Sequence, residues 1–121
     1  MIRGILLVGA LLSVVACATQ QPRVLSGPEV RSELVGGGFR YSGFGNASGV
    51  LFTGHLQILP NGNITFATDS GLHDAGTWRL TGNTICAQFE LFLSGDETCF
   101  TVKQLEKDKF LTSEGFFLYR A

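Results

Sequence analysis

The chain has 121 residues, with 9 basic and 10 acidic side chains and a formal net charge of −1. This length supports one domain with one core. The nearly neutral charge, with Arg and Lys scattered singly, argues against a nucleic-acid-binding face, so we expect a small domain that binds no nucleic acid.

The N-terminus has the layout of a secretory signal. Arg3 supplies one positive charge, and Ile5 to Ala16 is a run of apolar and small residues that ends at Cys17. This run is shorter than the roughly 20 residues that a transmembrane helix needs. The sequence therefore predicts a signal peptide over residues 1–16 rather than a membrane span.

The end of this signal, Val14-Val15-Ala16-Cys17, resembles the bacterial lipobox. The resemblance implies cleavage before Cys17 and acylation of that residue, and each buried methylene of an acyl chain contributes about 0.8 kcal/mol to membrane binding. An ordinary cleaved signal, with Cys17 merely near the cut site, is the alternative. Residues 17–25, polar and interrupted by Pro22, then form a lipidated tether. In enteric bacteria, Asp directly after the lipidated cysteine tends to retain a lipoprotein in the inner membrane, and here that residue is Ala18. We therefore expect the lipid anchor to lie in the outer membrane, with the domain facing the periplasm.

A short helix is predicted to begin after Ser26. Glu29 lies three residues after Ser26 and completes a capping box. Val30 and Leu34 give the helix one apolar side, and Gly36-Gly37-Gly38 ends it. A helix this short is not stable alone, so we expect it to pack against the rest of the domain.

From Phe39 onward apolar residues alternate with polar ones, and turn signals recur about every ten residues. The residues expected to face inward are Val50, Phe52, Leu56 and Ile58, then Ile64 and Phe66, Trp78 and Leu80, Ile85, Ala87 and Phe89, Phe100 and Val102, Phe110, and some of Phe116 to Tyr119. We predict a mainly β domain over residues 26–121, a small antiparallel up-and-down barrel of seven or eight strands.

Two cysteines, Cys86 and Cys99, remain if Cys17 carries lipid, and disulfides persist outside the cytoplasm. Their spacing is not C-x-x-C and neither has a nearby His in the sequence, which argues against a redox or metal pair. Cys86 shares a side with Gln88, and Cys99 shares one with Lys103. We therefore predict a Cys86–Cys99 disulfide on the outside of a hairpin, and no metal site.

No catalytic constellation stands out. His73 with Asp69 and Asp74 is a weak candidate for a metal or acid–base site, because such groupings are common by chance in a flexible loop. His55 lies on the polar face of a predicted strand. The glycine-rich segment 43–49 joins two predicted strands and opens no helix, so it lacks the amide cradle of a phosphate loop. No serine has the context of a nucleophile elbow. We expect no enzyme activity and no cofactor.

Several segments resemble small secreted, lipocalin-like proteins of Gram-negative bacteria, namely Leu25 to Arg31, Gly76 to Leu80, and Cys86 with Cys99-Phe100. The resemblance implies a lipocalin-like form of the barrel and brings no catalytic residue. The segment from Gly76 to Leu80 is also similar, more loosely, to periplasmic barrel-type inhibitors of metalloproteases. The inhibitory N-terminal arm of those proteins has no recognisable counterpart in this chain.

We expect a non-enzymatic envelope lipoprotein that acts as a binding or structural module and presents its loops to a protein or cell-wall partner. Two alternatives stay open. A carrier of a small apolar ligand would line a cavity with the ten Phe residues and Trp78, whereas an eight-stranded barrel is only just wide enough for its own side chains. A protease inhibitor would act through residues 18–25.

Overall fold

The computed structural model describes residues 21–44 and 49–121. The expected signal peptide, Cys17 and the middle of the glycine-rich segment lie outside these residues. In chain order the elements are β1 (Arg23–Val24), α2 (Gly27–Leu34), β2 (Gly38–Gly43), β3 (Phe52–Ile58), β4 (Asn63–Thr68), β5 (His73–Thr81), β6 (Thr84–Phe89), the 3-10 helix η2 (Phe92–Gly95), β7 (Glu97–Phe100), β8 (Val102–Glu106), β9 (Lys109–Thr112) and β10 (Phe116–Arg120). Neither helix in the described ranges is long and apolar enough to cross a membrane.

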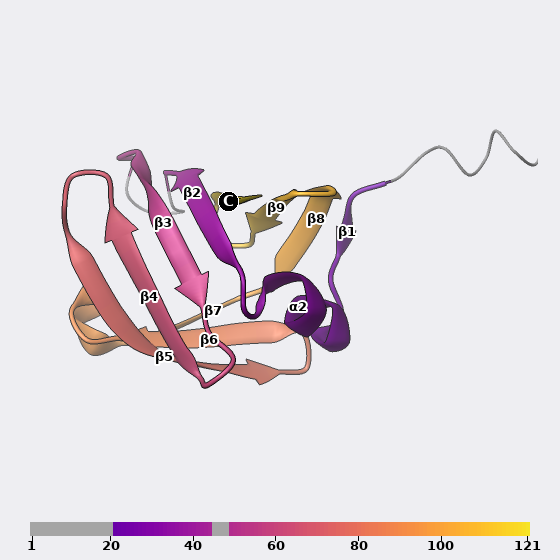
Figure 1. Ribbon diagram of the computed structural model, residues 1–121, viewed down its shortest axis with the longest axis horizontal. Coiled ribbons are helices and arrows are strands. Elements are labelled where there is room, and N and C mark those ends of the chain that lie inside the picture. Colours follow the sequence, from indigo (N-terminus) through magenta and orange to yellow (C-terminus); the bar gives the residue numbers. More distant parts are fainter. Residues whose placement is uncertain (1–20, 45–48) are drawn as a thin grey trace, which may run out of the picture.

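The strands form one antiparallel sheet in the order β1-β8-β9-β10-β2-β3-β4-β5-β6-β7. This sheet curls on itself into a half-barrel (Figure 1). The predicted mainly β, antiparallel fold with one short helix near the N-terminus is confirmed. The described chain has ten strands rather than seven or eight, because residues 23–24 add a strand and the predicted strand around Phe100 is divided in two.

The division lies at Thr101, between β7 and β8. β7 pairs with β6, whereas β8 pairs with β9 and β1. The Thr101 amide donates to Ser113 Oγ at 3.0 Å, and the Ser113 amide donates to the Thr101 carbonyl at 3.0 Å. Because a nearly continuous stretch of chain is hydrogen-bonded to β6 in its first half and to β9 in its second, the sheet must bend until these two strands lie near each other.

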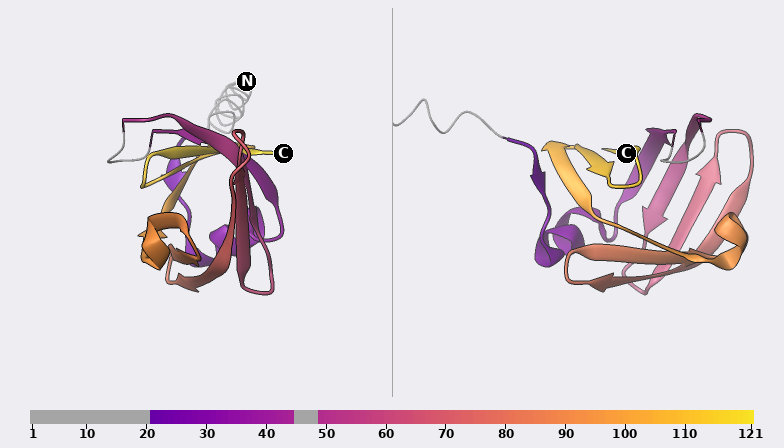
Figure 2. Two further views of the ribbon diagram at one scale, coloured as in Figure 1. Left: turned by 90° about the vertical axis from the view of Figure 1, so that its left-hand side faces the viewer. Right: turned by 180° about the vertical axis from the view of Figure 1, so that it is seen from behind.

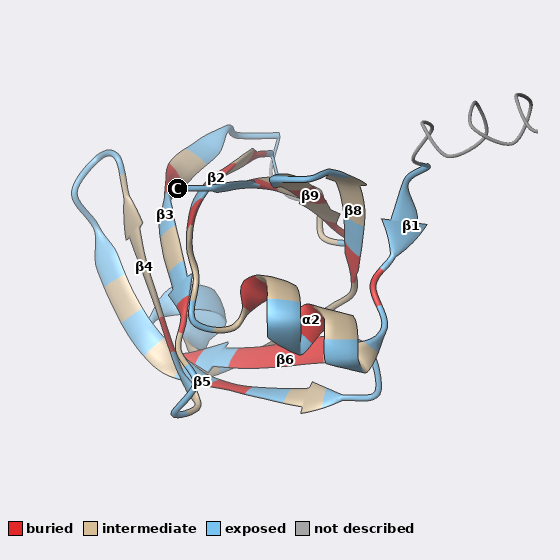
Figure 3. Cartoon of the chain, turned by 45° about the vertical axis from the view of Figure 1, so that its right-hand side comes forward, coloured by how far each residue is buried: buried red, intermediate tan, exposed pale blue. Residues whose placement is uncertain are grey.

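Helix α2 lies across one end of the curled sheet (Figure 3). The Glu29 amide donates to Ser26 Oγ at 3.3 Å, and the Ser26 amide donates to Glu29 Oε1 at 3.0 Å, which is the predicted capping box. Val30 and Leu34 are fully buried against the sheet. The predicted helix, its cap and its buried side are therefore confirmed.

Residues 23–25, which the sequence analysis assigns to the tether, belong to the folded domain. Arg23 and Val24 pair with Gln104 and Lys103 of β8. Leu25 is fully buried, and its amide donates to the Val102 carbonyl at 2.8 Å. Leu25 precedes the Ser26 cap and Val30 is the fourth helical residue, and both belong to the buried core, as in a hydrophobic staple.

The core fills the space between α2 and the inner face of the sheet. Its largest fully buried side chains are Phe39, Phe110, Leu25, Leu34, Ile58, Ile64, Ile85, Leu118, Val30 and Val102. Trp78, predicted to lie in the core, is 9% exposed, and its Nε1 donates to the Leu59 carbonyl at 2.8 Å. The polar atom of this buried ring is therefore satisfied.

The curled sheet has two different ends. We call the end covered by α2 the helix end. The opposite end, formed by residues 44 and 49–51 and by the loops 69–72, 90–96 and 113–115, is the open end. The left-hand view of Figure 2 looks onto the open end, with α2 behind it. Gln21, where the described chain begins, lies at the helix end, where it lines one hollow together with Glu33 and Lys107.

Candidate functional site

The predicted Cys86–Cys99 disulfide is present, joining two residues that face each other directly across β6 and β7. It lies on the outer side of the sheet beside Glu97, whose carboxylate accepts hydrogen bonds from Arg79 at 3.0 and 3.2 Å. The two sulfurs and this carboxylate have the spacing of metal ligands. Because the sulfurs are bonded to each other and the carboxylate is paired with Arg79, this cluster is a covalent link rather than a metal site.

The weak candidate site around His73 is not assembled. His73 and Asp74 begin β5 instead of lying in a loop, so their side chains leave opposite faces of the sheet. Asp69 is ion-paired with Arg40 at 2.8 Å and accepts a hydrogen bond from Thr53 Oγ1 at 2.7 Å. The Thr53 hydroxyl, outweighing the opposing effect of desolvation and aided by Arg40, lowers the pKa of Asp69.

The two histidines share the outer face of the sheet. His55 and His73 lie on either side of Ala67 in one row across β3, β4 and β5. Arg40 Nη1 contacts His55 Nε2 at 3.4 Å. An open hollow of about 710 Å³ lies here; its lining includes both histidines and extends to Asp74, Glu90 and Leu91. It is on the outer face, so it is not the interior cavity that a carrier would need.

The exposed apolar side chains of the molecule gather at the open end. Among the described residues, ten large apolar side chains are exposed, and all but Val24 and Tyr119 lie at this end. They are Phe44, Val50, Leu51, Phe52, Leu72, Leu91, Phe92 and Leu93, which we call the apolar rim. Leu91 is 75% exposed and Leu72 is 68% exposed. Single exposed apolar residues are ordinary, but a group of them at one end marks a candidate contact surface.

Beneath the apolar rim lies a cluster of aromatic rings on the inner face of the sheet. Phe66 meets Phe89 edge to face with ring centroids 5.0 Å apart, and Phe92 of the rim lies 5.6 and 5.8 Å from these two rings. Tyr41 continues the cluster, at 6.3 Å from Phe66 and 6.0 Å from Phe116. These are favourable edge-to-face arrangements. These rings lie on the inner face at the open end and contact the rim through Phe92.

A glycine in β3 allows one of these rings to approach the sheet. A Cβ atom on Gly54 would lie 2.0 Å from the Ala67 carbonyl oxygen and 2.7 Å from the Tyr41 hydroxyl. No side chain larger than hydrogen fits there without moving the neighbouring strand. Burial, with a smaller contribution from the charge of Asp69, raises the pKa of the Tyr41 hydroxyl.

The most exposed part of the rim, Leu91 to Leu93, is held outward by a strained loop. Leu93 has φ of 58° and Ser94 has φ of 55°, so two consecutive non-glycine residues adopt the left-handed conformation. Each such residue costs about 1 to 2 kcal/mol. This backbone strain coincides with the exposure of Leu91 and Leu93, which are 75% and 49% exposed.

Asp74 fixes this loop to β5. Its Oδ2 accepts hydrogen bonds from the amides of Leu91 at 3.0 Å and Phe92 at 2.7 Å. Desolvation acts to raise the pKa of Asp74, but the amides of Phe92, Ala75 and Leu91 together outweigh it, so the pKa lies below its ordinary value. Asp74 is therefore a carboxylate at neutral pH, and this charge keeps the apolar loop in place.

The apolar rim was not predicted from the sequence, in which the alternation placed Val50 and Phe52 on the inner face, whereas both are exposed. The available signal was Leu91-Phe92-Leu93, which follows Phe89 and breaks the alternation of the preceding strand before Ser94-Gly95 turns the chain. Alternation reports which face of a strand is apolar. It does not report which loops the fold brings to the same end, so the rim could not be assembled from the pattern.

Comparisons with protein-family models, with curated proteins and with solved structures find no match for this chain. The family resemblances of the sequence therefore stay predictions. Function is inferred from the geometry and charge of the described residues.

Proposed function

We propose that this protein is a non-enzymatic envelope lipoprotein whose folded domain is a binding module, and that the apolar rim is its binding surface. The observation that carries the proposal is that eight of the ten large exposed apolar side chains in the described part of the chain gather at one end. Soluble surfaces seldom expose apolar side chains together unless something covers them. The strained loop supports the same interpretation, because it holds Leu91 and Leu93 in water at an energetic cost.

The position of Gln21, the first described residue, favours a partner away from the anchoring membrane. Lipidation at Cys17 and insertion in the outer membrane are part of this proposal. Cys17 precedes Gln21 by only a few residues, and Gln21 lies at the helix end beside Glu33. The lipid would then hold the helix end towards the membrane, and the apolar rim would face the periplasm.

We also propose that the curled sheet is a lipocalin-like up-and-down barrel of seven or eight strands. The described sheet has eight strands when β7 and β8 are counted as one strand bent at Thr101 and the two-residue β1 is left out. The bent strand pairs with β6 and with β9, which supports closure. In such a barrel the aromatic cluster beneath the rim would fill the interior, which favours a binding module over a carrier of a small apolar ligand.

The third alternative, a protease inhibitor acting through residues 18–25, has less support. Residues 23–25 pair with β8 or lie in the core, so they are not available as a free inhibitory arm. The binding module is therefore the function that the geometry supports best.

The test is site-specific photo-crosslinking in the envelope of cells that make the full-length protein. A photoreactive residue at Leu91 or Leu72 is expected to give a discrete crosslinked species. The same residue at Tyr119, an exposed ring away from the open end, is the matched control and is expected to give none. Equal yields at all three positions, or no product at Leu91 and Leu72, would contradict the proposal.

Two further measurements accompany the crosslinking. Labelled palmitate should enter the wild-type protein and not a Cys17→Ser variant; label that persists in the variant would overturn the anchor. Mass spectrometry of an organic extract should find no lipophilic molecule bound in a stoichiometric amount. Such a molecule would favour the carrier instead.

A further inference from the structure

We infer that the partner bound at the open end is a cationic, amphipathic polypeptide segment. This inference rests on the proposed function of the apolar rim and names the chemistry of its partner. The rim favours a partner with apolar side chains, and the charges around the rim determine whether a positively or a negatively charged partner is attracted. The charges around the rim are an observation independent of its exposure.

The open end is negatively charged. The described residues that form this end, 44, 49–51, 69–72, 90–96 and 113–115, include no Lys or Arg. Asp69 and Glu97 lie at this end, but they are paired with Arg40 and Arg79, which reach them from the strands. Four more carboxylates belong to it, and no ion pair among the described residues involves them. They are Asp74, Glu90, Asp96 and Glu114.

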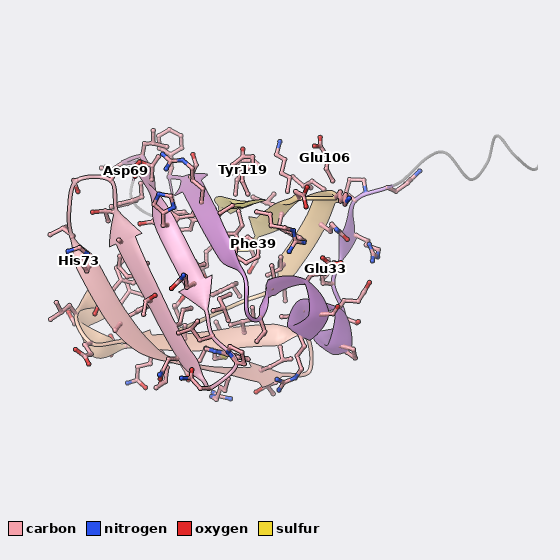
Figure 4. All side chains as sticks on the ribbon, in the orientation of Figure 1. Glu33, Phe39, Asp69, His73, Glu106 and Tyr119 are labelled. Atoms are coloured by element: carbon pink, nitrogen blue, oxygen red, sulfur yellow. A yellow bond between two sulfur atoms is a disulfide. The ribbon has the colours of Figure 1, made fainter. Side chains whose placement is uncertain are left out.

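The helix end has a different balance of charge. Arg120 pairs there with Glu33 at 2.7 Å and with Asp108 at 2.9 Å. Arg31 lies over the Trp78 ring at 5.8 Å, so this cation is matched by an aromatic face rather than by a carboxylate. Figure 4 shows Asp69 and His73 at the end of the molecule away from Glu33. The uncompensated negative charge is thus concentrated beside the apolar rim.

The acidic residues bracket the most exposed apolar side chains. Glu90 and Asp96 lie immediately before and shortly after Leu91 to Leu93 in the same loop. A partner whose apolar side chains cover this loop therefore brings its flanking residues close to two carboxylates. Lys or Arg at those flanking positions would be attracted, whereas Asp or Glu would be repelled.

This charge pattern disfavours an anionic lipid surface. Phospholipid headgroups of negative charge would be repelled by the same carboxylates that attract a cationic partner. The rim also involves three separate loops, which is more than a small ligand would cover. An amphipathic polypeptide, with one apolar side and basic flanks, is long enough to contact all three loops and carries the charge that the carboxylates attract.

The experiment uses the mature lipidated protein anchored in vesicles of phosphatidylcholine. The probes are a labelled helical peptide of Leu and Lys, a matched peptide with Glu in place of Lys, and anionic vesicles containing phosphatidylglycerol. Binding is measured above that of protein-free vesicles. We expect the Lys peptide to bind about tenfold or more tightly than the Glu peptide, with an affinity that falls as salt rises.

Three variants separate the contributions. The combined change Glu90→Gln, Asp96→Asn and Glu114→Gln should lower affinity for the Lys peptide about tenfold and flatten its salt dependence. Leu91→Ser with Leu93→Ser should abolish binding of the Lys peptide. Glu106→Gln, an exposed carboxylate of β8, is the matched control and should leave binding unchanged.

Equal binding of the two peptides, lost in the Leu91→Ser and Leu93→Ser variant, would overturn the inferred charge preference and leave the rim as a binding surface. Bridging to anionic vesicles without binding of the Lys peptide would also overturn the inference, in favour of a membrane partner. A Lys peptide that binds equally well to the leucine variant would contradict the rim itself. These outcomes distinguish failure of this inference from failure of the proposed function.

Discussion

At the scale of the single residue, Asp74 decides the geometry of the candidate site. Its carboxylate accepts the amides of Leu91 and Phe92, which otherwise lie in a loop without a strand partner. Charge-assisted hydrogen bonds to backbone amides are about twice as strong as neutral ones. Asp74 therefore holds the segment that carries Leu91, Phe92 and Leu93, although this segment is distant from it in the sequence.

The titration of Asp74 is expected to loosen the loop in acid. A carboxyl group whose pKa is lowered by folding contributes stability above its pKa in the unfolded chain, and this contribution is lost as pH falls through the lowered folded value. The amide shifts of Leu91 and Phe92, measured by NMR, should therefore move together below about pH 4. In an Asp74→Asn variant this movement should be absent. Amide shifts that titrate only above about pH 5 would contradict this role of Asp74.

At the scale of the element, α2 depends on its cap more than on its length. The helix has 8 residues, too few for stability in isolation. Ser26 and Glu29 satisfy amides at its start, and Arg23 pairs with Glu29. The Ser26 amide, followed by the Arg23 guanidinium, lowers the pKa of Glu29 through hydrogen bonding. The cap thus joins β1, α2 and the sheet.

Removal of the cap should destabilise the whole domain. Ser26→Ala is expected to lower the free energy of unfolding by about 1 kcal/mol, because the Glu29 amide loses its acceptor. Ser32→Ala is the matched control, since Ser32 is an exposed serine of the same helix, and it should change stability by less than about 0.5 kcal/mol. Urea unfolding of both variants measures the difference. Equal losses of unfolding free energy in the two variants would show that the Ser26 cap does not stabilise the domain more than an ordinary helix serine does.

At the scale of the whole molecule, the curl of the sheet depends on the passage of the chain from β7 to β8. The Cys86–Cys99 bond ties β7 to β6 just before that passage. Thr101 and Ser113 then exchange hydrogen bonds on the other side. The disulfide thus holds the segment around Thr101 to β6, and the hydrogen bonds hold it to the end of β9. These two strands lie near opposite edges of the sheet.

Loss of the disulfide should cost stability without changing the fold. The two cysteines are separated by 13 residues in the chain, and a bridge over a loop of this size contributes about 3 kcal/mol in the chain-entropy model. The paired change Cys86→Ala and Cys99→Ala should lower the free energy of unfolding by that amount in denaturant, with an unchanged β-sheet circular dichroism spectrum. Reduced wild-type protein should match the double variant. A variant as stable as the oxidised wild type would contradict this estimate.

Features that depend on near neighbours along the chain could be read from the sequence. The capping box of Ser26 and Glu29, the alternation that buries Ile58 and Ile64, and the facing positions of Cys86 and Cys99 were all predicted correctly. A cap or a strand face is determined within a few residues, because its hydrogen bonds and side-chain directions follow the local backbone.

The tertiary structure alone determined where distant segments meet. Three features have no local signal in the sequence. They are the break at Thr101, the pairing of Arg23 and Val24 with β8, and the position of Leu72 and Leu91 at the same end. Each depends on which strands are neighbours in the curled sheet and on the direction in which each strand runs. Those relations arise from burying the whole apolar surface at once, so the candidate site became visible only in three dimensions.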